Sequence, residues 1–352
     1  MKVSVKKLPK SEVEIEGELD AETLESYFGK ALKRLGDSLD LDGFRKGKIP
    51  ENVLISKIPE IRILEEMAEL ALAEHYPKIV ESEKLDAISR PEVSVTKLAR
   101  KNPLGFKIKT AILPEIKLPK YKDIAKGILR SELGNLKRSD LEVSDEDVEN
   151  TIMDIRKSRA PKVHMTEGAS VDEKEKSIEP ELPPFNDEFV QALGPFKNVE
   201  DFKIKLKENI KLEKENTHKE KTRLKIIDKI IDDSSMELPE ILLQIELDKI
   251  LYRMESDITQ MGLKFEDYLK HLNKTKEDLR KEFRNDAEKK AKLALILNEI
   301  SKVEKIVADE EQVTKEVATI LEHYKDADPE RARMHAENVL TNEKIFQFLE
   351  SQ

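Results

Sequence analysis

The first part of the chain changes between strand-like and helix-like hydrophobic patterns. Residues Glu12–Leu19 place charged and mostly apolar side chains at alternate positions, and this period of two predicts a half-buried strand. Asp20 predicts an N-cap for a helix over Ala21–Leu35, where apolar residues recur on one helical face. A long helix is predicted over Ile61–Lys84, kinked or broken at Pro77 because proline has no N–H to donate.

Two more alternating segments follow these helices. Glu92–Leu98 and Gly105–Leu113 are both predicted to be strands. Because the order is strand, helices, strands, we expect helices packed on an antiparallel sheet and not a βαβ repeat. Residues 1–115 are therefore predicted to form an α+β domain.

The pattern weakens between residues 116 and 181. Leu141–Val143 is typical of a short strand, and Ser144 predicts an N-cap for a helix over Asp145–Arg159. Thr166–Glu181 is polar and nearly free of large apolar residues. We predict a linker here that holds one short strand and one helix.

From Leu182 onward the pattern is helical, and ten of the eleven glycines lie before residue 195. Three amphipathic stripes are expected to pack: Leu224, Ile227, Ile230 and Ile231; Leu242, Ile245, Lys249 and Tyr252; and Leu293, Ile296, Leu297, Ile300 and Val303. Residues 182–352 are therefore predicted to form an all-α, elongated domain.

Composition supports extended, charged modules. Charged residues make up 39% of the 352 residues, and hydrophobic residues 38%, against about 45–50% apolar in an average domain. The net charge of −10 is uneven, since residues 1–127 carry 24 basic and 22 acidic side chains. A contact with nucleic acid must therefore be local, and the first third is the place to expect it.

Several chemistries find no support in the sequence. The absence of cysteine excludes disulfides, Cys-based zinc sites and a thiol nucleophile, and the six histidines form no HExxH pair. No GxSxG, Walker A or GxGxxG pattern occurs, so we assign no catalytic residue, metal or cofactor, although a paired-carboxylate enzyme stays open. With neither a signal peptide nor an 18-residue apolar run, a cytoplasmic protein without membrane contact is expected.

The most specific local feature is the segment Gly43–Pro50, with the sequence GFRKGKIP. Its two glycines permit a tight turn, between which Phe44 offers an apolar anchor and Arg45 and Lys46 offer two cations. Such an exposed tip suits a phosphate-rich or acidic surface. The alternative is a solvated turn whose Phe44 folds back into the core.

In its context this motif, Gly43-Phe44-Arg45-x-Gly47-x-x-Pro50, resembles the signature loop of trigger factor, a family of bacterial ribosome-associated chaperones. The likeness extends over almost the whole chain, including Leu141–Arg159 and the Pro183–Phe189 start of the helical part. The resemblance implies docking on the large ribosomal subunit, with its protein and rRNA near the exit tunnel. Phe44, Arg45 and Lys46 would dock, and Gly43, Gly47 and Pro50 would shape the loop.

The chain also departs from that family. Its members usually insert an FKBP-type prolyl isomerase domain of on the order of 100 residues, whereas only 161–181 lies between the matching flanks here, without Phe, Tyr or Trp. We expect the isomerase domain and its activity to be absent, although the family often carries the label peptidyl-prolyl cis-trans isomerase.

Methionines and aromatics recur in the C-terminal part. Four of these apolar residues are candidates for binding substrate: Met254, Met261, Leu263 and Phe265. The alternative for each is ordinary helix–helix packing. By resemblance, the helical region holds unfolded nascent polypeptides without ATP, and a homodimer off the ribosome is a further expected partner. The rival functions are a prolyl isomerase and a holdase or assembly chaperone that works independently of ribosomes.

Overall fold

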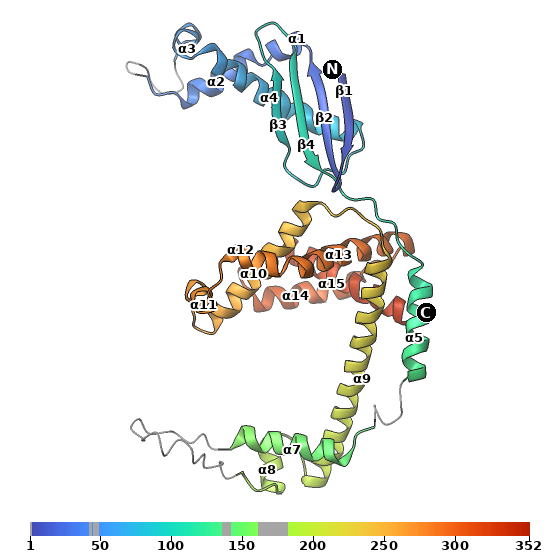
Figure 1. The fold of residues 1–352 in the computed structure, drawn as a ribbon. Coiled ribbons are helices and arrows are strands. Elements are labelled where there is room, and N and C mark those ends of the chain that lie inside the picture. The colour runs from blue at the N-terminus through green and yellow to red at the C-terminus, as the bar shows by residue number, and fades with distance from the viewer. Residues whose placement is uncertain (1, 42–43, 45–48, 136–141, 161–181) are drawn as a thin grey trace. The chain divides into compact units, whose positions relative to one another are not determined.

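The computed structural model describes residues 2–41, 44, 49–135, 142–160 and 182–352 (Figure 1). Contacts between residues divide the chain into two units. The first unit contains Met1–Pro119 and Asp233–Lys305, and the second contains Lys120–Asp232 and Ile306–Gln352. Helices from the C-terminal half of the sequence therefore contribute to both units.

A four-stranded antiparallel sheet begins the first unit (Figure 1). Its order is β1-β2-β4-β3, with the bounds β1 Lys2–Leu8, β2 Glu12–Leu19, β3 Glu92–Lys97 and β4 Leu104–Ala111. Strand β2 has its predicted bounds, and the predicted fold class is confirmed. Strand β1 was not predicted, although Val3 and Val5 alternate with polar residues there.

The sheet has one buried and one charged face. Ile15 of β2 and Phe106 and Ile108 of β4 are fully buried, in one core with Met67 of the helical layer. On the opposite face Lys109 pairs with Glu12 at 2.7 Å. Side chains of a strand point alternately to its two faces, so the period of two in the sequence sorts the core from the surface.

Four helices complete this part: α1 Ala21–Glu25, α2 Phe28–Ser38, α3 Glu51–Lys57 and α4 Glu60–Ser82. The single helix predicted over Ala21–Leu35 is two helices. They separate where the N–H of Tyr27 donates to the carbonyl of Leu24 at 3.1 Å, a tight i−3 bond. Of the kink or break predicted at Pro77, the break is absent: α4 continues to Ser82, and Ile79 reaches the core.

The other helices of the first unit are α10 Glu240–Gln260, α11 Phe265–Leu272, α12 Lys276–Glu282 and α13 Arg284–Glu304. The stripe predicted along α10 was wrong. Ile245 and Tyr252 are exposed, whereas Leu243, Leu247 and Leu251 are buried against neighbouring helices. In α13, Ile296 and the other predicted positions pack except Val303, which is exposed.

The regular elements among the second unit's described residues are all helices: α5 Tyr121–Asn135, α7 Asp145–Arg159, α8 Asp187–Leu193, α9 Val199–Asp233, α14 Glu310–His323 and α15 Pro329–Glu350. Helix α5 was not predicted, and residues 142–143 form no strand. Helix α7 has its predicted bounds and N-cap. In α9, Leu224 is exposed and Ile226 is buried, which shifts the predicted stripe. Arg223 fastens α9 to α15 through Glu343 and Glu350.

Candidate functional site

The predicted docking loop joins α2 to α3. Gly43, Arg45, Lys46 and Gly47 lie outside the described residues. Phe44 and Pro50 are described, together with the loop's two ends.

Phe44 does not belong to the core of its unit. Its side chain is 39% exposed, and its N–H donates to the carbonyl of Leu41 at 3.1 Å. Pro50 is the N-cap of α3, and its carbonyl accepts from the N–H groups of Val53 and Leu54. An aromatic residue of this loop is therefore exposed, and a proline, whose φ is fixed, begins the helix at the loop's C-terminal end.

The base of the loop is tightly packed. A methyl group placed on Gly36 of α2 would lie 2.8 Å from Cδ1 of Leu54 in α3. Because Leu54 is buried, a larger residue at position 36 would force its side chain to shift within the core. Ile49 is buried, and Leu39 and Leu41 pack against the same core. The two ends of the loop are therefore anchored in the core.

The four substrate-binding candidates have different environments. Met261 and Leu263 are 76% and 55% exposed on either side of Gly262, whose φ of +80° makes the turn between α10 and α11. Phe265 is buried and Met254 is partly buried, both in the cluster formed by α10, α11 and α12. Only the turn residues are open to a partner.

Helix α10 exposes further apolar side chains, which the sequence reasoning had not proposed for binding and of which it had assigned Ile245 and Tyr252 to a packing stripe. Ile241, Ile245 and Tyr252 follow the spacing i, i+4, i+11 of one helical face, and all are exposed. Nearby, residues of α10, α11 and α13 line a cavity of about 460 Å³ that includes Met254 and Tyr268. The signal lay in the sequence as apolar residues on more than one face of this helix.

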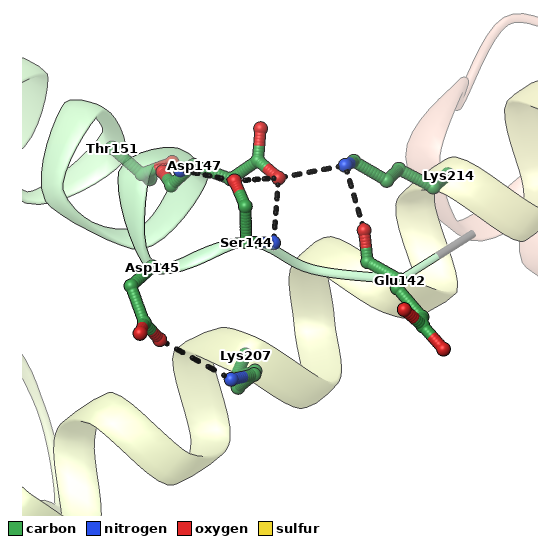
Figure 2. A network of polar contacts seen from close by, with 7 residues as sticks. All are labelled: Glu142, Ser144, Asp145, Asp147, Thr151, Lys207 and Lys214. Atoms are coloured by element: carbon green, nitrogen blue, oxygen red, sulfur yellow. Dashed lines mark hydrogen bonds and ion pairs between the residues drawn. The ribbon is translucent and has the colours of Figure 1, made fainter. Parts of the chain in front are cut away.

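Helix α7 is held to α9 by a polar network (Figure 2). The Ser144 hydroxyl accepts from the Asp147 N–H at 3.1 Å, while the Asp147 carboxylate accepts from the Ser144 N–H at 2.9 Å. The same carboxylate accepts from Nζ of Lys214 at 2.8 Å. Hydrogen bonds from Lys214 and Ser144 lower the pKa of Asp147 from 3.8 to about 2.

The end of α7 and the segment that precedes α8 lie close together, and both belong to the group formed by α7, α8 and α9. Nε of Arg156, near the end of α7, donates to the carbonyl of Pro183 at 2.8 Å. Val148 and Ile152 of α7 share a core with Val190 of α8 and Phe202 of α9. The group therefore has a packed interior of its own on both sides of residues 161–181.

Among the described residues no group of His, Asp and Glu side chains is arranged to hold a metal ion. Within the same ranges, none of the helices has the length and apolar character needed to cross a membrane.

Comparison of the sequence with models of known families shows to which family the chain belongs. The family model described as bacterial trigger factor protein matches residues 1–155, and the model of its C-terminus matches residues 198–349. The chain belongs to the trigger factor family. Trigger factors of three bacteria illustrate the likeness, which extends over most of each chain.

The trigger factor of Pelotomaculum thermopropionicum is 25% identical over 409 residues, covering 95% of this chain and 91% of the relative. That of Carboxydothermus hydrogenoformans is 25% identical and covers 96% and 95%. The Bacillus subtilis trigger factor is 24% identical and covers 87% and 88%.

A solved structure shares the fold, with a TM-score of 0.56 at 18% identity over the whole of both chains. Its description concerns promiscuous substrate recognition in the folding and assembly activities of the trigger factor chaperone. Family membership supports a chaperone role for this chain.

Proposed function

We propose that this chain is an ATP-independent chaperone of the cytoplasm that docks beside the ribosomal exit tunnel and binds nascent polypeptides. The observation that supports the docking step is that Phe44 is exposed in this loop. The base of the loop is packed around Gly36 and Leu54. An anchored base reduces the entropy lost when a tip binds. Arg45 and Lys46 add cations suited to rRNA phosphates and acidic protein groups.

Exposed apolar side chains support the binding of unfolded chains. Met261 and Leu263 lie at one turn, and the α10 face of Ile241, Ile245 and Tyr252 adds a second group. Scattered apolar contacts give weak, multivalent binding that tolerates many sequences. Such contacts need no nucleotide, because release follows from weak affinity at each contact.

The alignments support the absence of an isomerase domain. The alignment with the P. thermopropionicum relative spans 409 residues, whereas 95% of this 352-residue chain is about 334 residues. About 75 alignment positions therefore hold no residue of this chain. The two family models leave only 156–197 between them, and the hydrogen bond from Arg156 to the carbonyl of Pro183 places the two described flanks close together. We therefore assign no isomerase activity.

Co-sedimentation with ribosomes tests the docking step. Phe44, Arg45 and Lys46 are replaced together by alanine, and we expect the protein to stay in the supernatant while its helical circular dichroism is unchanged. The matched control replaces exposed Tyr324, Lys325 and Arg331, again one aromatic and two cations. If the loop variant pellets as the unaltered chain does, docking through this loop is wrong, and a holdase that works without ribosomes takes its place.

A further inference from the structure

A groove of about 590 Å³ lies between α4 and the edge strand β3, which are neighbours in Figure 1. Helix α4 lines one side with apolar residues and with the carboxylates of Glu65 and Glu69. The other side is lined by Pro91, Val93, Val95 and Leu98. The lining is mostly apolar. It contains two carboxylates and no cation.

The groove is an uncovered end of the core face of the sheet. Val93 lies opposite Ile108, and Val95 lies opposite Phe106, in the antiparallel β3–β4 pairing. Opposed residues point to the same face, and Ile108 and Phe106 are fully buried under the helices. Val93 and Val95 nevertheless remain 46% and 44% exposed, because the helical layer stops short of β3.

The strand itself is an open edge. Among the described residues β3 pairs only with β4, and every residue from Glu92 to Lys97 is exposed. Edge strands are normally protected, since their free N–H and C=O groups pair with other chains. Here the regular edge is short. Pro91 precedes it, and a bulge between Val95 and Lys97 ends it.

The bulge is built into the sheet. A methyl group on Gly105 would lie 2.7 Å from Oγ1 of Thr96 and 3.0 Å from Cβ of Lys97, so glycine lets β4 run closely beside the bulged segment. The open edge therefore has a defined length, and this limits uncontrolled association of whole sheets.

We propose that this groove binds an extended segment of unfolded polypeptide as a fifth strand beside β3. Backbone hydrogen bonds to the edge make binding tolerant of sequence, and alternate apolar side chains enter the groove beside Val93 and Val95. A lysine or arginine of the segment reaches Glu65 or Glu69. This proposal rests on the proposed chaperone function and adds a client site in the same part of the chain as the docking loop.

Charge selects this occupant over a second copy of the chain. Glu65 and Glu69 are paired with Arg62 at 3.3 Å and Arg34 at 3.0 Å, but these pairs are exposed and weak. Either carboxylate is free to exchange its partner for a cation of the bound segment. A twofold pairing of two β3 strands would instead bring the two acidic rims toward each other.

The test uses the full chain and a fluorescein-labelled peptide in which valine and threonine alternate, with lysine at each end. Anisotropy gives its affinity. Ala73→Phe adds a bulky ring at an exposed position of the groove lining and is expected to weaken binding about tenfold. Glu65→Gln with Glu69→Gln is a second variant that needs no repacking. This variant is expected to bind the lysine-ended peptide about tenfold more weakly. Its binding of an otherwise identical peptide with serine ends should change much less.

Glu60→Gln with Glu81→Gln, on α4 outside the groove lining, is the control and should bind as the unaltered chain. Unchanged affinity in the folded Ala73→Phe and the double-glutamine variant would overturn the groove while leaving other client sites intact. If the groove variants lose a dimer on size-exclusion chromatography but keep their affinity for the peptide, the groove binds a second copy of the chain. A chain that binds no peptide and prevents no aggregation would refute the proposed chaperone function itself.

Discussion

Asp147 and Lys214 stand 67 positions apart in the sequence, and yet the Lys214 ammonium donates to the Asp147 carboxylate at 2.8 Å (Figure 2). The same carboxylate completes the capping box at the start of α7. One side chain therefore both begins a helix and fastens it to α9, so local and tertiary structure depend on it together.

Acid should loosen α7 from α9. The pKa of Asp147 is lowered from 3.8 to about 2 by its hydrogen bonds from Lys214 and Ser144. A depressed carboxyl pKa gives stability that is present above 3.8 and is lost as the pH falls toward 2. Asp147→Asn should lower the melting temperature at neutral pH and flatten its change over this acid range, measured by circular dichroism.

Asp154→Asn is the control on the same helix, because Asp154 is 78% exposed and lies 3.9 Å from Lys157. Its melting curve should follow that of the unaltered chain at every pH. Equal curves for both variants would contradict the role given to Asp147.

Glu240 should contribute to the pairing of α10 with α13. Its two oxygens accept from the two Nη atoms of Arg284 at 2.9 Å each, and this contact chiefly lowers the pKa of Glu240 to about 2. Because the pair is partly exposed, Glu240→Gln should cost about 1 kcal/mol or less. A double-mutant cycle with Arg284→Gln in urea unfolding measures the coupling, and additive losses would show that the contact contributes nothing.

The packing at the base of the docking loop should depend on Gly36. Gly36→Ala places a methyl group 2.8 Å from Leu54, and such overpacking costs about 1–3 kcal/mol. Gly29 lies on the same helix with no atom within 4 Å of an added methyl group. Gly29→Ala should therefore stabilise the chain by about 0.5–1 kcal/mol. Denaturant midpoints compare the two, and a similar shift for both would refute the account of the base.

Exposed and buried candidates for client binding should separate by their effects. Met261→Ser with Leu263→Ser should weaken suppression of aggregation of an unfolded protein and leave the melting temperature unchanged, because both residues are exposed. Phe265→Ala should instead lower stability by about 3–5 kcal/mol, since its ring is buried. Stable protein after the Phe265 change would contradict its place in the core.

Prolyl isomerisation should be absent. A refolding reaction limited by proline isomerisation should keep its slow phase of tens to hundreds of seconds in the presence of the chain. A known prolyl isomerase in the same assay is the positive control. Acceleration by catalytic amounts of the chain would show that an isomerase site exists here.

Local signals in the sequence were sufficient where a single turn or one strand decides the structure. The alternation over Glu12–Leu19 predicted β2 with its bounds, and Ser144 predicted the start of α7. The docking role of Phe44 and its glycine-rich surroundings stays a prediction, to which the structure adds that Phe44 is exposed.

Local signals failed where several faces of a helix are apolar. Helix α10 has hydrophobic residues around much of its circumference, so its periodicity does not say which face packs. Contact with α11, α12 and α13 decides that Leu243, Leu247 and Leu251 are buried. Ile245 and Tyr252 remain exposed for the same reason.

The sequence by itself determined strand β2, the N-caps Asp20 and Ser144, and the motif that resembles the family's signature loop, because these depend on neighbours a few residues apart. Only the tertiary structure decided that Asp147 meets Lys214, that Phe265 is buried, and that Val93 and Val95 stay open beside α4. Burial depends on contacts with residues distant in sequence, and a local pattern does not indicate which of those residues pack against a given side chain.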